Sequence, residues 1–178
     1  MIYTTYYHSP LGRILLAADD KGLIGVWFEG QKYFADKIGE DALQMENEIL
    51  RQTAKWLDIY FSGKEPDFTP AIHMIGSDFR KLVWNILLDI PYGKTMTYGD
   101  IARKIATEHH RGKMSAQAVG GAVGHNSISM IIPCHRVVGT NGSLTGYAGG
   151  IAKKVKLLEL EHADVGSLYM PKKENTVR

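Results

Sequence analysis

Three observations predict a mixed α/β (α+β) fold for this chain. Two apolar runs near the N-terminus are separated by a turn-rich stretch, which is typical of a β-hairpin. Later segments place apolar residues at helical spacing, with one side to bury. A segment with several glycines and prolines divides the two halves. With 178 residues, of which 44% are hydrophobic and 22% charged, the chain can bury a core in one large or two small domains.

The first half is predicted to form strands followed by a helix. Residues 14–18 and 23–28 are apolar runs that flank residues 19–22, whose residue types favour a turn. A helix is expected over residues 42–61, because its apolar residues mostly follow helical spacing and Gly63 comes next as a stop signal.

The boundary between the halves is expected in residues 62–77. This segment contains two glycines and two prolines and has no clear apolar period. We therefore predict an N-terminal domain over residues 1–76, a C-terminal domain over residues 77–165 and a polar tail over residues 166–178.

The second half is predicted to be helical, with a first helix over residues 79–87 and a last helix over residues 155–160. Between them, Thr97 is a capping residue for one short helix and Ser115 for another. The helix over residues 115–123 is rich in small residues. Two short helices in succession fit either a helix-turn-helix or a plain helical hairpin.

Charge is distributed unevenly along the chain, although the formal net charge is only +2. Residues 1–78 contain 7 Lys and Arg against 12 Asp and Glu, whereas residues 79–162 contain 11 against 5. The basic second half suits a polyanionic partner, although a solvated basic surface explains the same excess.

The sequence shows no signal for export or for membrane insertion. The N-terminus has no basic segment followed by a long apolar one, and no uncharged apolar stretch is long enough to span a bilayer. A single cysteine also fits a reducing compartment. We therefore predict a cytoplasmic protein that binds no membrane.

The only cysteine, Cys134, lies between Pro133 and the basic residues His135 and Arg136. A lone cysteine has no disulfide partner within the chain, so it is either a small buried side chain or a nucleophile. Adjacent positive charge favours the thiolate, which is the reactive form. The neighbours of Cys134 therefore favour a nucleophile.

Residues 79–162 resemble the C-terminal domain of the O6-alkylguanine–DNA alkyltransferases (methylated-DNA–protein-cysteine methyltransferases). The segments that carry the resemblance are Pro91-Tyr92-Gly93, Thr97-Tyr98-Gly99-Asp100-Ile101-Ala102, Ala118-Val119-Gly120-Gly121-Ala122, Asn126, Pro133-Cys134-His135-Arg136-Val137, Gly146-Tyr147-Ala148-Gly149-Gly150 and Leu157-Leu158. The first half resembles the N-terminal domain of the family less sharply, beginning at Ser9.

This resemblance implies both a fold and an activity. The fold is a ribonuclease-H-like N-terminal domain followed by a winged helix-turn-helix domain. The activity is DNA repair by direct, irreversible transfer of the methyl group from O6-methylguanine to the cysteine, in a single turnover. The resemblance leaves open whether O4-methylthymine is also a substrate.

The resemblance also implies roles for individual residues. Cys134 would accept the alkyl group, His135 would act as its base through a bridging water, and Glu161 would hold the histidine. Asn126 would stabilise the turn that bears the active site, and Tyr98 would donate a hydrogen bond to the leaving guanine. The residues expected to contact the base or the DNA are Ser115, Gln117, Ala118, Gly121, Arg136, Val137, Tyr147, Ala148 and Gly149.

One departure concerns the residue that fills the gap left by an extruded base. The family usually has an arginine where this chain has Gln117. Either glutamine fills the gap by hydrogen bonds alone, or Arg111 or Lys113 in the preceding loop replaces the arginine. Ser129 and Ala148 also differ from some relatives, which leaves the range of accepted alkyl groups open.

Other functions compete with this one. A protein that binds alkylated bases without removing the alkyl group is the nearest alternative, but relatives of that kind lack the cysteine. A Cys–His hydrolase is disfavoured because adjacent residues on an extended segment point to opposite sides. A regulatory role for the helix-turn-helix stays open. We expect a monomer that binds double-stranded DNA containing alkylated guanine, with no metal and no cofactor.

Overall fold

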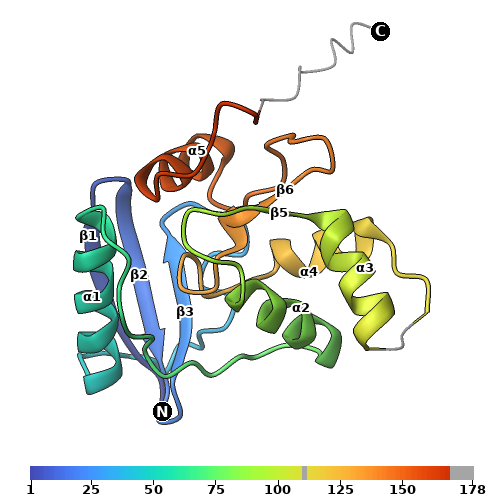
Figure 1. The fold of residues 1–178 in the computed structure, drawn as a ribbon. Coiled ribbons are helices and arrows are strands. Elements are labelled where there is room, and N and C mark those ends of the chain that lie inside the picture. Colours follow the sequence, from blue (N-terminus) through green and yellow to red (C-terminus); the bar gives the residue numbers. More distant parts are fainter. Residues whose placement is uncertain (110–111, 169–178) are drawn as a thin grey trace, which may run out of the picture.

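The computed structural model describes residues 1–109 and 112–168 of the protein. The first half forms a four-stranded sheet in the order β3-β2-β1-β4 and one long helix, α1 (Figure 1). β1 pairs antiparallel with β2 and parallel with the short β4 at the sheet edge. The strands are β1 (Tyr3–Ser9), β2 (Gly12–Ala18), β3 (Leu23–Phe28) and β4 (Leu43–Gln44).

The predicted hairpin is confirmed by the antiparallel pairing of β2 with β3. Asp19 closes its turn, because one carboxylate oxygen accepts hydrogen bonds from the backbone N–H groups of Lys21 and Gly22. Every residue of β3 is buried, so the other edge of this strand also needs hydrogen-bond partners. The backbone around Ile128 supplies some of them: Val26 donates to the carbonyl of Ser127 at 2.7 Å. The sheet is thereby joined to the second half of the chain.

Helix α1 (Glu48–Phe61) begins six residues later than predicted. Asn47 caps it by accepting a hydrogen bond from the N–H of Leu50. The preceding Leu43 and Met45 are exposed, so their apparent helical spacing marked no buried face, and Leu43 instead pairs with Tyr3 in the sheet. The predicted start at residue 42 was therefore wrong because a capping signal outweighed the apolar pattern.

The second half consists mainly of short helices. The capping box at Thr97 is confirmed, with both reciprocal hydrogen bonds to Asp100 present, and Ser115 caps the next helix. The last helix begins at Ile151, four residues earlier than predicted. The elements are α2 (Asp78–Leu88), β5 (Met96–Thr97), α3 (Tyr98–Glu108), α4 (Ala116–Gly124), the 3₁₀ turn η1 (Cys134–Arg136), β6 (Val137–Val138) and α5 (Ile151–Leu160).

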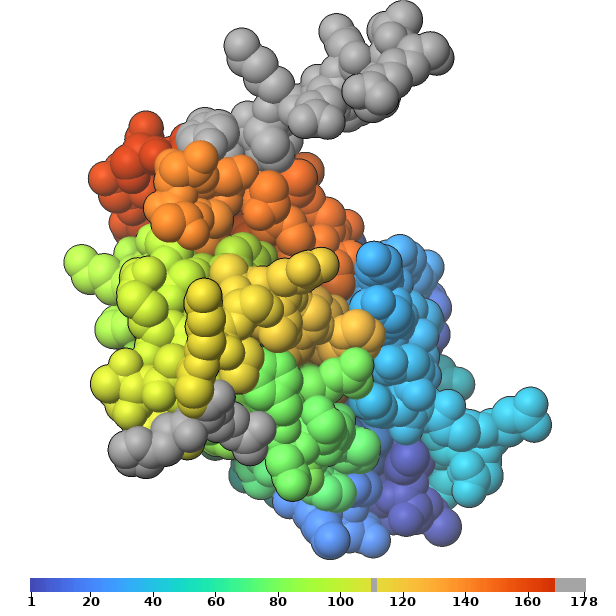
Figure 2. Space-filling view, turned by 90° about the vertical axis from the view of Figure 1, so that its right-hand side faces the viewer, coloured from blue at the N-terminus to red at the C-terminus, as the bar shows by residue number. Residues whose placement is uncertain are grey.

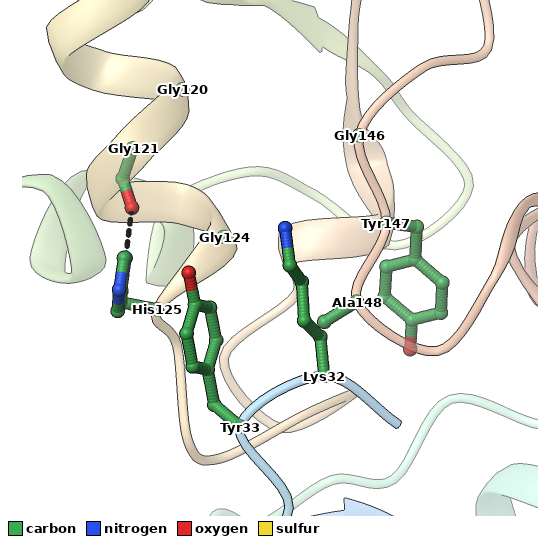
Figure 3. A pocket seen from close by; sticks show the side chains of 9 residues that line it. All are labelled: Lys32, Tyr33, Gly120, Gly121, Gly124, His125, Gly146, Tyr147 and Ala148. Atoms are coloured by element: carbon green, nitrogen blue, oxygen red, sulfur yellow. Dashed lines mark hydrogen bonds between the residues drawn. The ribbon is translucent and has the colours of Figure 1, made fainter. Parts of the chain in front are cut away.

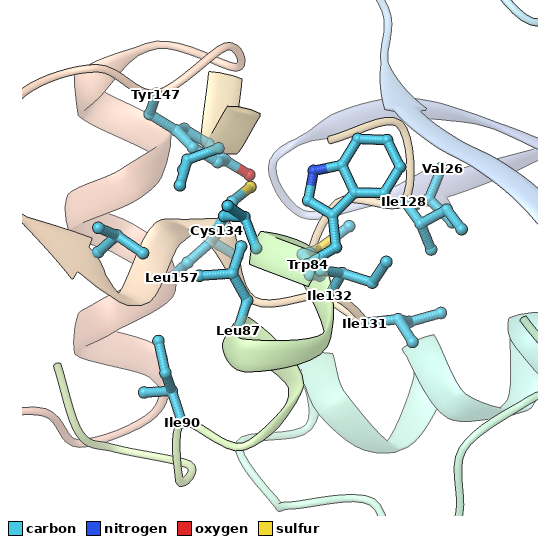
Figure 4. Packing of buried hydrophobic residues seen from close by; sticks show 14 of the residues in the cluster. Val26, Trp84, Leu87, Ile90, Ile128, Ile131, Ile132, Cys134, Tyr147 and Leu157 are labelled. Carbon is cyan, nitrogen blue, oxygen red and sulfur yellow. The ribbon is translucent and has the colours of Figure 1, made fainter. Parts of the chain in front are cut away.

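One buried cluster runs through both halves. Val26 of the first half belongs to the same cluster as Trp84, Cys134 and Leu157 of the second (Figure 4). In Figure 2, light-blue residues of the first half lie directly beside yellow and orange residues of the second. The halves therefore share a core, and the turn that bears Cys134 packs inside it.

Two predictions fall outside the part of the chain that the structure describes. Arg111, one of the two residues considered as a substitute for the missing arginine, is not among the described residues, and neither are residues 169–178 of the predicted tail. Within the described ranges, no helix is long and apolar enough to cross a membrane.

Candidate active site

Cys134 lies at the start of the turn η1, only 6% exposed. The preceding segment is held by Asn126, whose side-chain amide donates to the carbonyl of Ile132 at 2.8 Å. The amide oxygen of Asn126 accepts from the N–H of Ile128 at 3.0 Å. This buried asparagine therefore fixes the loop that leads into the cysteine, where the resemblance had placed it.

Burial raises the pKa of the Cys134 thiol. The nearby polar groups, namely the Asn126 side chain and the backbone at Cys134 and His135, and the positive charge of Lys154 act in the opposite direction without overcoming burial. His135 and Arg136, whose positive charge was expected to favour the thiolate, both direct their side chains to Glu161. The resting thiol is therefore protonated at neutral pH and needs a base before it can react.

Glu161 is the centre of a buried hydrogen-bond network. Its carboxylate accepts hydrogen bonds from Nε2 of His135, from Nε of Arg136 at 2.7 Å, from the hydroxyl of Tyr60 at 2.6 Å and from the N–H of Gly93 at 3.1 Å. Burial alone would raise its pKa, but the interactions with His135 and Arg136 lower it to about 2. Glu161 is therefore a carboxylate at neutral pH.

His135 is fully buried, and burial lowers its pKa although the hydrogen bond to Glu161 opposes the shift. The neutral ring donates its Nε2 proton to Glu161, which leaves Nδ1 with a lone pair. Nδ1 is buried and has no hydrogen-bond partner among the residues described. An imidazole held in this way can accept a proton at Nδ1 while the carboxylate stabilises the resulting charge.

Lys154 is a residue of the site that the sequence analysis missed. It is fully buried on α5, and its ammonium group donates to the carbonyls of Val137 and Thr145. Burial lowers its pKa to about 8, while its interaction with Cys134 works in the other direction. A signal was present in the sequence, since Lys154 lies three and four positions before Leu157 and Leu158 on the apolar side of the helix.

Tyr60 was missed as well, although its helix was predicted. Its spacing after Trp56 and Leu57 identified a buried position on α1. No local pattern indicates that its hydroxyl meets Glu161 in the other half of the chain.

Tyr98 faces the loop that follows β6. Its hydroxyl donates a hydrogen bond to the carbonyl of Thr145 at 3.2 Å, and burial raises its pKa to about 12. Gly146, at φ 73°, lies against it, and a Cβ there would come within 2.9 Å of that hydroxyl oxygen. Only glycine suits this position, both for its left-handed backbone and for this close approach.

A pocket of about 240 Å³ opens between this loop and α4 (Figure 3). Its residues are Lys32, Tyr33, Gly120, Gly121, Gly124, His125, Gly146, Tyr147 and Ala148. Figure 4 shows the Tyr147 hydroxyl directed toward the sulfur of Cys134, and that hydroxyl has no hydrogen-bond partner among the described residues. Gly149 follows in the same loop and packs against Tyr147 and Phe28.

The residues assigned by resemblance to DNA contact lie in two different environments. On α4 and its cap, Ser115, Gln117, Ala118 and Gly121 are exposed, and Lys113 precedes them as an exposed residue. Arg136 and Val137 are buried instead. Arg136 donates to Glu161 and to the carbonyl of Ile90, and Val137 forms part of β6.

The described residues contain no group of three or more His, Cys, Asp or Glu side chains arranged to hold a metal ion. What they do bring together is a thiol, a neutral imidazole and a buried carboxylate. Such a set can perform nucleophilic chemistry in which the base is oriented by a third group.

Two family models match the chain. Residues 2–73 match 6-O-methylguanine DNA methyltransferase, ribonuclease-like domain, and residues 78–163 match 6-O-methylguanine DNA methyltransferase, DNA binding domain. The chain is 43% identical over 162 residues to the methylated-DNA–protein-cysteine methyltransferase of Methanosarcina acetivorans, covering 90% of this chain and 98% of the relative. It is 50% identical over 161 residues to that of Mycobacterium tuberculosis, covering 90% and 93%.

Solved structures agree with these matches. The crystal structure of the M. tuberculosis O6-methylguanine methyltransferase is similar with a TM-score of 0.77 at 38% identity, over 91% of this chain and 93% of that one. The crystal structure of M. tuberculosis OGT in complex with DNA is similar with a TM-score of 0.79 at 35% identity, over 93% and 98%. The predicted fold, a ribonuclease-like domain followed by a DNA-binding domain, is confirmed.

Proposed function

The chain belongs to the 6-O-methylguanine DNA methyltransferase family and repairs methylated DNA, and we propose that Cys134 accepts the methyl group of O6-methylguanine in one irreversible turnover. The observation that carries this assignment is the hydrogen-bonded pair of His135 and Glu161 directly after the cysteine. This pair supplies the base that a protonated, buried thiol requires.

Activation of the thiol begins with the free nitrogen of His135. A water bridging Sγ of Cys134 and Nδ1 of His135 would carry the thiol proton to the ring. The carboxylate of Glu161 keeps the ring in the required tautomer and stabilises the imidazolium that forms. Lys154 adds a positive charge that favours the thiolate.

The transfer itself is a displacement at the methyl carbon. The thiolate sulfur forms a bond to this carbon as the bond from the carbon to O6 breaks, and the electron pair of that bond stays on O6. The guanine leaves as an anion and takes up a proton. Tyr98, whose pKa of about 12 keeps it protonated, supports the leaving guanine with a hydrogen bond. The product is a thioether, so each protein molecule repairs one lesion.

The methylated oxygen is inaccessible inside a duplex, so the damaged nucleotide must be extruded at a cost of about a few kcal/mol. The exposed side of α4, with Ser115, Ala118 and Gly121, would lie in the minor groove, and Gln117 would enter the gap. The pocket beside Tyr147 would hold the base, with the backbone amides of Ala148 and Gly149 near the modified oxygen. O4-methylthymine is a second substrate to be tested.

We further propose that the protein acts in the cytoplasm, as a monomer without a cofactor, and that its domains divide at residue 76. Support for the monomer comes from the network itself, because Tyr60, His135 and Glu161 all belong to the same chain. Support for the boundary comes from Ser77, which caps α2 and so begins the second domain.

The deciding experiment measures the intact mass of the protein after incubation with a duplex that contains one O6-methylguanine. We expect a gain of one methylene per protein molecule, located on the peptide that contains Cys134, and no further gain with excess duplex. A protein that retains the damaged duplex tightly and gains no mass would instead be a lesion-binding protein.

A Cys134→Ser variant is the matched control. It should bind the methylated duplex as the wild type does and transfer nothing, because a hydroxyl is a far weaker nucleophile than a thiolate. Methyl transfer that survives this change would mean that another residue accepts the group.

A further inference from the structure

A short segment of the N-terminal domain lies against the DNA-binding half of the protein. Lys32 and Tyr33 follow β3 and face α4 across the pocket, which they line together with Gly121 (Figure 3). Gly121 comes four positions after Gln117, so the two residues share one exposed side of α4. The segment that carries Lys32 is therefore next to the side of α4 that would meet DNA.

The backbone of this segment is held from several directions. The N–H of Lys32 donates to the carbonyl of Ala148, in the loop that follows β6, at 3.2 Å. The ring of Tyr33 stacks on that of His125, at the C-terminal end of α4, with centroids 4.2 Å apart. The buried side chain of Gln31 accepts a hydrogen bond from the N–H of the last residue of β3 at 2.8 Å. The fold therefore fixes the point from which the Lys32 side chain starts.

The ammonium group of Lys32 extends into the space between α4 and the loop at Gly146 (Figure 3). Lys32 is the only Lys or Arg among the nine residues that line the pocket, and the lining contains no Asp or Glu. It forms no ion pair with any residue of the described ranges. Its charge is the reverse of that of its domain, since residues 1–78 contain 12 Asp and Glu against 7 Lys and Arg. An ammonium group without a carboxylate partner favours an anionic partner from outside the chain.

We propose that Lys32 extends the DNA interface onto the N-terminal domain by contacting a phosphate beside the extruded nucleotide. This inference rests on the proposed function, in which the base enters between α4 and the loop at Gly146. A nucleotide that leaves the stack turns about its own backbone, so its flanking phosphates come to the mouth of this space. The ammonium group of Lys32 lies there with no acidic residue in the lining to compete for it. Such a contact holds the DNA in position without reading its sequence.

The test measures the affinity for a duplex that contains one O6-methylguanine, in a Cys134→Ser background so that no transfer occurs during the titration. Lys32→Gln should weaken binding by about threefold to fivefold, the size expected for an exposed ion pair. The logarithm of the affinity should also fall less steeply with the logarithm of the salt concentration, by about 0.9 in slope, because one phosphate fewer is neutralised. Lys32→Arg, which keeps the charge, should retain both the affinity and the slope.

Lys21→Gln is the matched control. Lys21 is exposed like Lys32 and belongs to the same domain, but it precedes β3 whereas Lys32 follows it. The strand between them spans about 20 Å, roughly twice the distance over which salt screens exposed charges. Lys21→Gln changes the net charge equally and should leave the affinity and the slope unchanged. If it weakens binding as much as Lys32→Gln does, only net charge matters and the inference is overturned.

An unmodified duplex of the same sequence tests where the phosphate lies. Lys32→Gln should cost less affinity for this duplex, because its guanine stays paired and stacked. Equal losses with both duplexes would place Lys32 away from the extruded nucleotide and overturn the inference, as would an affinity that Lys32→Gln leaves unchanged. The proposed function fails separately, since it is overturned only if the wild-type protein gains no methylene from the methylated duplex.

Discussion

The hydroxyl of Tyr60 donates a 2.6 Å hydrogen bond to Glu161, the carboxylate that also holds His135. The two residues are 101 positions apart, and both are buried. A helix of the N-terminal domain therefore supports the base of the C-terminal active site directly. The ribonuclease-like domain therefore positions Glu161 as well as contributing to the shared core.

Tyr60→Phe should destabilise the protein by about 1–3 kcal/mol, because a buried carboxylate loses one of its donors. Transfer should also slow, since Glu161 is held less firmly against His135. Urea unfolding and single-turnover transfer measure the two effects. Tyr7→Phe is the matched control: its hydroxyl donates to Asp58 at the same distance of 2.6 Å, but near the surface. Equal effects of the two variants would contradict a special role for Tyr60.

Glu161→Gln should slow transfer by about 100-fold or more while leaving the affinity for methylated duplex almost unchanged. A neutral amide cannot stabilise the imidazolium of His135, and among the described residues none of the hydrogen-bond partners of Glu161 lies on α4. Single-turnover rates at saturating duplex, together with binding titrations, measure both quantities. Equal losses in rate and affinity would indicate a purely structural role.

Stability should fall in acid because of the same carboxylate. The pKa of Glu161 is lowered from its usual 4.5 to about 2 in the folded protein. Its contribution to the free energy of unfolding is therefore complete above pH 4.5 and is lost as the pH falls from 4.5 to about 2. Protonation of buried His135, whose pKa is also lowered, acts in the same direction. Between pH 5 and pH 3 the protonation of Glu161 should lower the free energy of unfolding by about 2 kcal/mol.

Urea unfolding at a series of pH values checks this expectation. The wild-type protein should lose stability more steeply between pH 5 and pH 3 than Glu161→Gln does. Parallel curves would show that the pKa of Glu161 is not shifted by folding.

Lys154→Met should raise the pKa of Cys134 further, because the positive charge that opposes the effect of burial is removed. Alkylation of the thiol by iodoacetamide should then require a higher pH, and methyl transfer at neutral pH should slow. Lys156→Met is the control, since Lys156 is exposed on the same helix. If both variants show the wild-type pH profile, the charge of Lys154 does not act on the thiol.

Gln117→Arg should raise the affinity for damaged duplex, because a longer, charged side chain fills the gap left by an extruded base better than glutamine does. Binding titrations with methylated and unmodified duplexes measure the gain, and Gln117→Ala should lower the affinity for the methylated one. An unchanged or weaker affinity of the arginine variant would mean that another residue fills the gap.

Local signals in the sequence predicted most of the fold. The hairpin around Asp19, the capping box at Thr97 and the cap at Ser115 are each made by residues only a few positions apart, so spacing alone identifies them. The predicted start of α1 at residue 42 was wrong, although the Asn47 cap is an equally local signal. The apolar residues before Asn47 follow helical spacing without belonging to the helix.

The cysteine and its neighbours were also identifiable from the sequence, but their arrangement was not. Adjacency suggested that His135 and Arg136 act on the thiol through their charge, whereas the fold turns both toward Glu161. The contact of Tyr60 with Glu161 depends in the same way on the other half of the chain.

The sequence by itself determined the hairpin, the caps at Thr97 and Ser115 and the candidate nucleophile Cys134, because short-range hydrogen bonds and residue types depend only on near neighbours. The tertiary structure decided which carboxylate holds His135 and which lysine acts on the thiol. Those contacts join residues that lie far apart in sequence, and only the path of the folded chain brings them within hydrogen-bond distance.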